Sequence, residues 1–161
     1  MALTVRTVAI IAGLGAVTGA GALLASGGTD TGRHYVSNWA PAYRTFAKVY
    51  VKAYRPCLKG ATKQCADAQE LAAHAAIETA SMLSASTPPK NLARDVSHLE
   101  RDLRAAHRTL SASAAAARAG QTSPRRWCSA EQGPCTVVMI DMGNVIDDIN
   151  FVAKVDLPLP A

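Results

Sequence analysis

The chain has few aromatic and few charged residues for its length. Only 5% of its 161 residues are Phe, Trp or Tyr and 18% are charged, against about a quarter charged residues in an average soluble protein. No long uncharged apolar run follows the first 25 residues, which excludes a membrane protein with several spans. Alanine is abundant instead, and alanine favours helices over strands. The length predicts one folded domain.

The motifs of common enzymatic and cofactor chemistry are also missing. There is no Gly-x-Ser-x-Gly nucleophile motif, no Cys-x-x-Cys or Cys-x-x-Cys-His motif and no Glu-x-x-His repeat for a di-metal bundle. We therefore predict a non-enzymatic protein without cofactor or metal. Two alternatives stay open. One is a carrier of haem, through His34 or Tyr35, or of a small apolar ligand inside a bundle, and the other is an enzyme of unrecognised type.

The first 27 residues have the pattern of an export segment. A basic head precedes the uncharged apolar run 7–25, and small residues follow that run. This order is typical of a secretory signal peptide, and the run is also long enough to act as an uncleaved membrane anchor. Ser26 stands where a lipoprotein signal requires cysteine, so lipidation is not expected. We predict an extracytoplasmic protein that is secreted or attached to the membrane through residues 7–25.

Four cysteines lie beyond this segment, and an exported chain would place them in a compartment where disulfides form. Four cysteines allow three pairings. Because two close pairs each bracket a short turn-rich segment, we predict the disulfides Cys57–Cys65 and Cys128–Cys135.

Two amphipathic segments predict helices after a flexible lead at 28–37. The first helix is expected from Trp39 to Tyr54, with Pro41 tolerated in its first turn. The second is expected from Lys63 to Ser84, with Thr62 as its N-cap.

Two further amphipathic segments complete the predicted fold. A third helix is expected to start with Thr87 as N-cap and to end at Gly120, and a fourth is expected to start near Pro134. Apolar residues spaced three and four apart predict their core-facing seams. The seam of the third helix is Leu92, Val96, Leu99, Leu103, Ala106, Leu110 and Ala114, and that of the fourth is Val138, Met142, Val145, Ile149 and Val152.

These patterns predict an all-α fold, a four-helix up-down bundle stapled by disulfides and preceded by a signal or anchor segment. The predicted divisions are the signal or anchor at 1–27, the lead at 28–37, the bundle at 38–156 and a loose tail at 157–161. The tail is expected because prolines interrupt its backbone hydrogen bonding.

One predicted surface, a strongly basic helix face, indicates a class of binding partner. The stretch from Thr31 to Ala66 contains basic residues but no acidic one. Such a face can bind anionic lipid headgroups or an anionic wall polymer, or it can be a solvated face neutralised by Asp141 and Asp148 of a neighbouring fourth helix. The candidate contact residues are Arg44, Lys48, Lys52, Arg55 and Lys59, flanked by Tyr43, Tyr50 and Tyr54.

The sequence thus predicts an exported, non-enzymatic helical-bundle protein that binds an unknown protein or cell-envelope component. Nucleic acid is not an expected partner, because the chain is predicted to be exported and its formal net charge is only +5.

Overall fold

The structure is a computed structural model that describes residues 27–57, 62–121 and 134–160. Within these ranges the only regular structure is helix, which confirms the predicted all-α fold. The predicted signal or anchor lies outside them except for its last residue. No helix among the described residues is long and apolar enough to cross a membrane. The four helices are α1 (Gly27–Cys57), α2 (Lys63–Ser84), α3 (Ala93–Arg118) and α4 (Pro134–Ala153).

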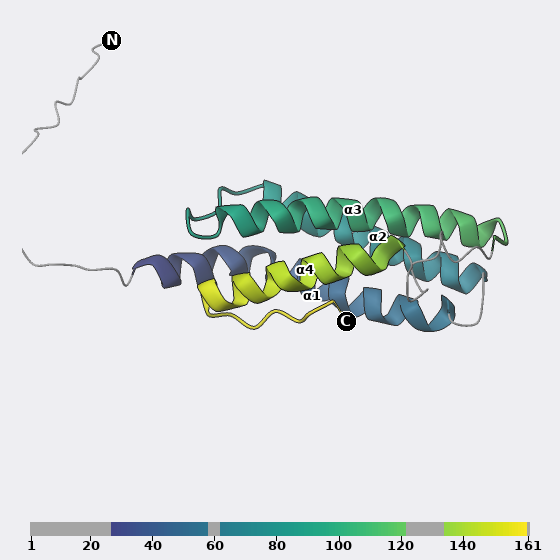
Figure 1. Cartoon of the computed structure of the whole chain (residues 1–161), viewed down its shortest axis with the longest axis horizontal. Coiled ribbons are helices and arrows are strands. Elements are labelled where there is room, and N and C mark those ends of the chain that lie inside the picture. The colour runs from purple at the N-terminus through teal and green to yellow at the C-terminus, as the bar shows by residue number, and fades with distance from the viewer. Residues whose placement is uncertain (1–26, 58–61, 122–133, 161) are drawn as a thin grey trace, which may run out of the picture.

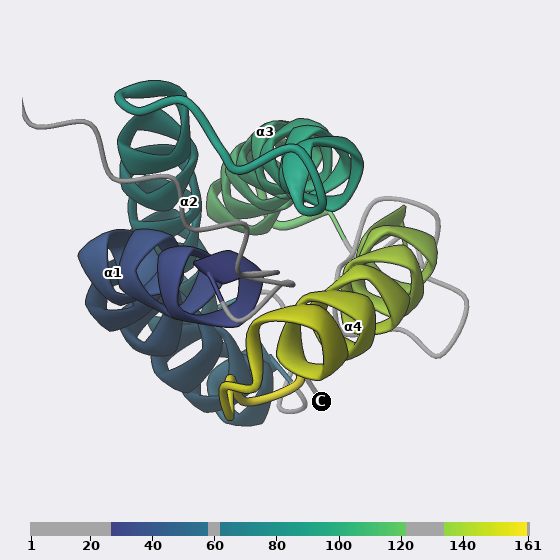
Figure 2. The same cartoon turned by 90° about the vertical axis from the view of Figure 1, so that its left-hand side faces the viewer.

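Helix α2 makes the most extensive contacts. It packs against both α3 and α1, while α3 also packs against α4, and α1 meets α4 over a much smaller area. The four helices lie side by side along the long dimension of the molecule (Figure 1). Seen end-on, α1 and α3 occupy diagonally opposite corners of the group (Figure 2). Surfaces on the outer sides of α1 and α3 therefore face in different directions.

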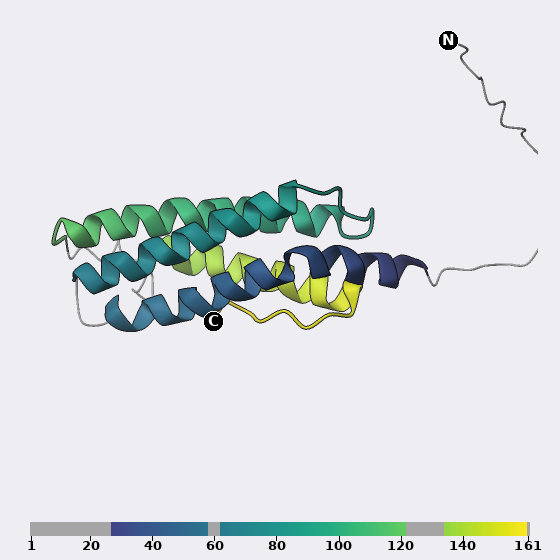
Figure 3. The ribbon, with the colours of Figure 1, turned by 180° about the vertical axis from the view of Figure 1, so that it is seen from behind.

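Helix α1 starts much earlier than the sequence predicts. The lead predicted at 28–37 is helical, and within it Tyr35 and Val36 are buried. Pro41 consequently lies inside the helix rather than in its first turn. A proline removes one backbone hydrogen bond and crowds the preceding turn. In agreement, α1 bends between its purple first part and its blue second part (Figure 3).

A row of aromatic side chains on α1, here called the aromatic column, lies in the core together with small residues of α2. Successive rings along the column are 6.0–6.5 Å apart between centroids, so each ring contacts the next. The facing residues of α2 are mainly buried alanines, which allow the two helices to approach closely. The column consists of Tyr35, Trp39, Tyr43, Phe46 and Tyr50.

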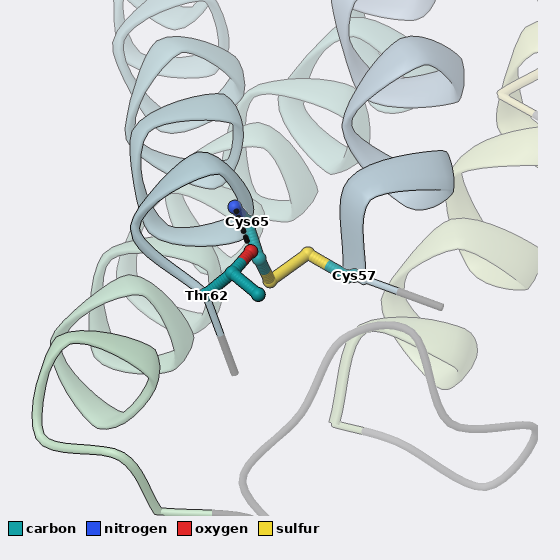
Figure 4. Close-up of a disulfide and its surroundings, with 3 residues drawn as sticks. All are labelled: Cys57, Thr62 and Cys65. Atoms are coloured by element: carbon teal, nitrogen blue, oxygen red, sulfur yellow. Dashed lines mark hydrogen bonds between the residues drawn. A yellow bond between two sulfur atoms is a disulfide. The ribbon is translucent and has the colours of Figure 1, made fainter. Parts of the chain in front are cut away.

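The disulfide Cys57–Cys65 joins the end of α1 to the first turn of α2, as predicted (Figure 4). The hydroxyl oxygen of Thr62 accepts a hydrogen bond from the backbone N–H of Cys65 at 3.1 Å, which confirms Thr62 as the N-cap of α2. Both predicted bounds of α2 are also confirmed. The predicted pair Cys128–Cys135 stays a prediction: Cys135 is disulfide-bonded, but Cys128 lies outside the described residues.

The seam predicted for α3 is confirmed, because every one of its members is buried. Gly120 adopts a φ of +66° just beyond the last turn, a conformation that favours glycine and ends the helix where expected. The predicted start is wrong. The N-cap is Leu92 rather than Thr87, and it contributes no side-chain capping bond. Packing of the buried Leu92 side chain, rather than a polar cap, fixes where α3 begins.

Helix α4 is rotated relative to the predicted seam. The fully buried face carries Met142, Ile146 and Ile149, whereas Val138, Val145 and Val152 lie at its half-buried margin. The predicted seam shares only Met142 and Ile149 with the observed buried face. Because α4 is apolar on most sides, its periodicity alone does not fix which side faces the core.

The chain folds back after α4 instead of forming a loose tail from residue 157. Lys154 adopts a left-handed φ of 53° and turns the chain. The Asn150 side chain then holds Leu157: its Nδ2 donates to the Leu157 carbonyl at 3.0 Å, and its Oδ1 accepts from the Leu157 N–H at 2.8 Å. Leu157 is 2% exposed and belongs to the main core cluster. The expectation of a loose segment was therefore wrong for Leu157.

Candidate functional site

The candidate basic face lies on the outer side of α1. Arg44, Lys48, Lys52 and Arg55 are all exposed, on the side of the helix opposite to the aromatic column. They recur every three or four residues, so they project from successive turns of one helix face. We call these four residues the basic face. Lys59, the fifth predicted contact, lies outside the described residues.

The flanking tyrosines do not all belong to this surface. Tyr43 is completely buried in the aromatic column, and Tyr50 is half-buried against the core. The side chain of Tyr54 is outside the described residues. Val51, 47% exposed, is instead the apolar side chain that lies among the cations. The sequence pattern misplaced Tyr43 because aromatic and basic positions alternate closely along α1.

The cations of the basic face have no acidic partner among the described residues. Every ion pair in this part of the chain lies within α2, within α3 or between the two helices. Arg118 illustrates the contrast, because its guanidinium contacts Asp67 at 3.8 Å and Glu70 at 3.5 Å. Within the described ranges the only polar contact of the basic face is from Arg44 Nη2 to the backbone carbonyl of Asp156, 3.2 Å away. Its positive charges are thus not paired with any acid of the described residues.

No ion pair among the described residues joins α4 to this face. Neither Asp141 nor Asp148 forms an ion pair with α1. The negative charge of Asp141 acts instead on Asp102 of α3, where burial above all, and also Asp141, raises the pKa of the carboxyl. The reason is the packing order: α4 lies mainly against α3 and has little contact with α1.

The histidines do not converge on one point. His74 contacts Glu70 at 3.6 Å on the exposed side of α2, and His107 Nδ1 lies 3.1 Å from the carbonyl of Ala73. His34 is exposed on α1, while its neighbour Tyr35 is buried with its hydroxyl donating to the Leu83 carbonyl at 3.5 Å. Among the residues that the structure describes, no cluster of His, Cys, Asp and Glu is arranged to hold a metal ion.

Three polar atoms in the core have no hydrogen-bond partner among the described residues: Trp39 Nε1, the Tyr43 hydroxyl and Gln69 Oε1. All three side chains are at least 98% buried. Burial raises the pKa of Tyr43, because an ionised phenolate would lose its hydration there. Sequence reasoning missed these atoms, since nothing local indicates that a tyrosine hydroxyl will find no acceptor.

A polar network between α2 and α3 was also missed. Glu100 Oε1 accepts hydrogen bonds from the Ser84 hydroxyl at 2.7 Å and from Arg104 Nε and Nη2 at 3.0 and 2.9 Å. Arg104 Nη2 lies within 3.2 Å of Ser84 Oγ as well. The Ser84 hydrogen bond first, and then Arg104, lowers the pKa of Glu100. The spacing of Glu100 and Arg104, one helical turn apart, was the only sequence signal available.

Comparison of this chain with protein-family models, with curated proteins and with solved structures found no match.

Proposed function

We propose that this protein is an exported, non-enzymatic helical bundle that binds an anionic component of the cell envelope through the basic face of α1. The observation that carries the proposal is the contrast in charge compensation. Several cations of α2 and α3 are paired with acids, whereas the four cations of the basic face have no acidic partner among the described residues. Uncompensated cations on one exposed face are available to an external polyanion.

The geometry of this face suits an extended anionic surface rather than one small ligand. From Arg44 to Arg55 the cations cover about 16 Å along the helix axis, taking a rise of about 1.5 Å per residue. Near an anionic membrane each basic residue contributes on the order of 1 kcal/mol. Four such residues with no acid between them therefore contribute several kcal/mol of attraction to an anionic membrane, on the order of 1 kcal/mol each. This attraction should weaken as salt is added, because the screening length is only about 8 Å at physiological ionic strength.

The remaining parts of the proposal concern topology and location. The four helices form an up-down-up-down bundle, supported by the short connections from α1 to α2 and from α2 to α3. Residues 1–27 act as a signal peptide or anchor, supported by their basic head and apolar run. An anchor would hold α1 close to the membrane surface, because that helix begins directly after the apolar run.

The test is co-sedimentation of the protein with liposomes of neutral lipid, with liposomes containing anionic phospholipid and with an insoluble anionic wall polymer. We expect binding to at least one anionic material but not to neutral liposomes, and the bound fraction should decrease as salt is raised. Comparing the fraction bound to anionic liposomes with the fraction bound to the wall polymer shows which of these two anionic materials the basic face recognises.

A matched pair of variants makes the test specific to α1. Lys48→Glu with Lys52→Glu should abolish binding, whereas Lys90→Glu with Arg94→Glu, which changes the net charge equally on exposed residues elsewhere, should leave most of it intact. Equal losses in both double variants would show that only the overall charge matters and would refute a site on α1.

A further inference from the structure

Two adjoining pockets lie on the outer side of α3, away from the basic face. The first, about 280 Å³, is lined by Ser97, Glu100, Arg101, Arg104 and Arg108, and we call it the arginine pocket. The second, about 430 Å³, is formed where the connection between α2 and α3 passes over α3, and we call it the hydroxyl pocket. The hydroxyl pocket lies within the range of about 300–1,000 Å³ that is usual for small-molecule sites, and the adjoining arginine pocket enlarges it.

The arginine pocket combines two arginines that already have acidic partners with a third, Arg108, that has none among the described residues. Arg104 is held by two hydrogen bonds to Glu100, so its guanidinium is oriented before any ligand arrives. Arg108 is exposed and has no acidic partner among the described residues, whereas Arg101 forms an ion pair with Asp102 at 3.8 Å. Three guanidinium groups against two carboxylates, Glu100 of the pocket and Asp102 beside Arg101, leave a local excess of one positive charge. Guanidinium groups favour phosphate and carboxylate because their paired N–H groups match two oxygens of one anion.

The hydroxyl pocket offers a different chemistry. Its apolar surface comes chiefly from the half-buried Pro88, because the lining side chains of Leu83 and Val96 are only 2% and 3% exposed, and the exposed hydroxyls of Thr87 and Ser97 lie beside it. Neither of these two hydroxyls forms a hydrogen bond within the described residues, so both are available to a ligand. Apolar surface interspersed with hydroxyl groups suits a polyol ring, which has an apolar C–H face and a polar rim.

The two pockets share Ser97 and Glu100, so a single ligand can occupy both. We propose that they form one binding site for a saccharide that carries a phosphate or carboxylate group. The anionic group would bind Arg101, Arg104 and Arg108, and the sugar ring would lie over the hydroxyl pocket with Ser97 at the junction.

The test is isothermal titration calorimetry of the protein with glucose 6-phosphate, glucuronate, inorganic phosphate and glucose. Both acidic sugars should bind at least about tenfold more tightly than inorganic phosphate, because only they occupy both pockets, and glucose should not bind measurably. If glucose 6-phosphate binds no more tightly than inorganic phosphate, the hydroxyl pocket does not recognise the sugar and the proposal is wrong.

Single substitutions assign the binding to these residues. Arg108→Gln should weaken glucose 6-phosphate by roughly tenfold, the loss expected for one charge-assisted hydrogen bond. Arg94→Gln is the matched control, since Arg94 is exposed on the same helix but lines neither pocket. Ser97→Leu should reduce the affinity for glucose 6-phosphate to that for inorganic phosphate. Equal weakening by Arg94→Gln and Arg108→Gln would indicate unspecific attraction to α3 and would overturn the assignment.

This site and the basic face can be tested independently. The Lys48→Glu and Lys52→Glu double variant should keep its affinity for glucose 6-phosphate, because α1 and α3 lie at diagonally opposite corners (Figure 2). Arg108→Gln should keep its binding to anionic liposomes or wall polymer. Loss of sugar binding in the α1 double variant would show that the two acidic sugars bind the basic face rather than the pockets of α3.

Discussion

Tyr43→Phe is expected to stabilise this protein, although Tyr43 is completely buried in the core. The hydroxyl of Tyr43 has no hydrogen-bond partner among the described residues. The unfolded chain exposes this hydroxyl to water, so folding removes its hydration without replacing it. Phenylalanine keeps the ring that contacts Trp39 at 6.2 Å and Phe46 at 6.1 Å between centroids, so the aromatic column should remain packed.

The size of the effect follows from the burial of a single unpaired hydroxyl. Measurements on proteins place that cost at about 1–3 kcal/mol. Part of it will be offset by the small space left by the oxygen, so we expect a gain of about 1–2 kcal/mol in the free energy of unfolding. Chemical denaturation should show a higher midpoint with an unchanged m-value, and the melting temperature should rise by roughly 3–6 °C per kcal/mol.

The pH dependence offers a second readout of the same group. Burial raises the pKa of the folded Tyr43 phenol above its ordinary value of 10.0. Above pH 10 the unfolded chain releases this proton while the folded chain retains it, so the stability of the unsubstituted protein should decrease as the pH rises. The difference in stability between Tyr43→Phe and the unsubstituted protein should therefore become larger above pH 10.

Tyr35→Phe is the matched control. It removes a hydroxyl from the same column, but the hydroxyl of Tyr35 donates to the Leu83 carbonyl at 3.5 Å. Its loss should leave the stability unchanged or slightly reduced. A Tyr43→Phe variant that is less stable than the original protein would refute the reasoning, because it would show that the Tyr43 hydroxyl is hydrogen-bonded in solution, for example to an internal water.

Three further predictions concern the disulfide, the buried carboxyl and the chain end. Selective opening of Cys57–Cys65, by alanine substitution of both cysteines, should lower the free energy of unfolding by about 2–3 kcal/mol in chemical denaturation, as expected for closing a short loop. Asp102→Asn should be more stable than the original protein at pH 7, since burial raises the pKa of Asp102. That difference should shrink as the pH falls and disappear well below the ordinary carboxyl value of 3.8, where the carboxyl is protonated in both states, and unfolding curves in strongly acidic buffer and at pH 7 would check this. Asn150→Ala should cost about 1–2 kcal/mol, because it removes both hydrogen bonds to Leu157, and hydrogen exchange should show faster exchange at the Leu157 amide.

Features that depend on residues close together in the chain could be predicted from the amino-acid pattern alone. Thr62 precedes an apolar repeat and caps α2 through a bond to a backbone N–H three residues away, so both the cap and the helix start were predictable. The seam of α3 was predictable because its apolar residues occupy one narrow stripe with arginines on the other side. The disulfide Cys57–Cys65 followed from the short turn-rich connection between two helices.

Other features could not be predicted from the pattern of neighbouring residues, because they depend on contacts between helices. Helix α1 continues back to Gly27 because Tyr35 and Val36 pack into the core, a gain that the glycine-containing local sequence does not reveal. The orientation of α4 depends on which neighbour it packs against, since apolar side chains surround most of that helix. The same packing places α4 mainly against α3, and within the described part of the chain the basic face has no acidic partner. Helix periodicity specifies which side of a helix is apolar, but the choice of neighbour is set by contacts between segments that are distant in the chain.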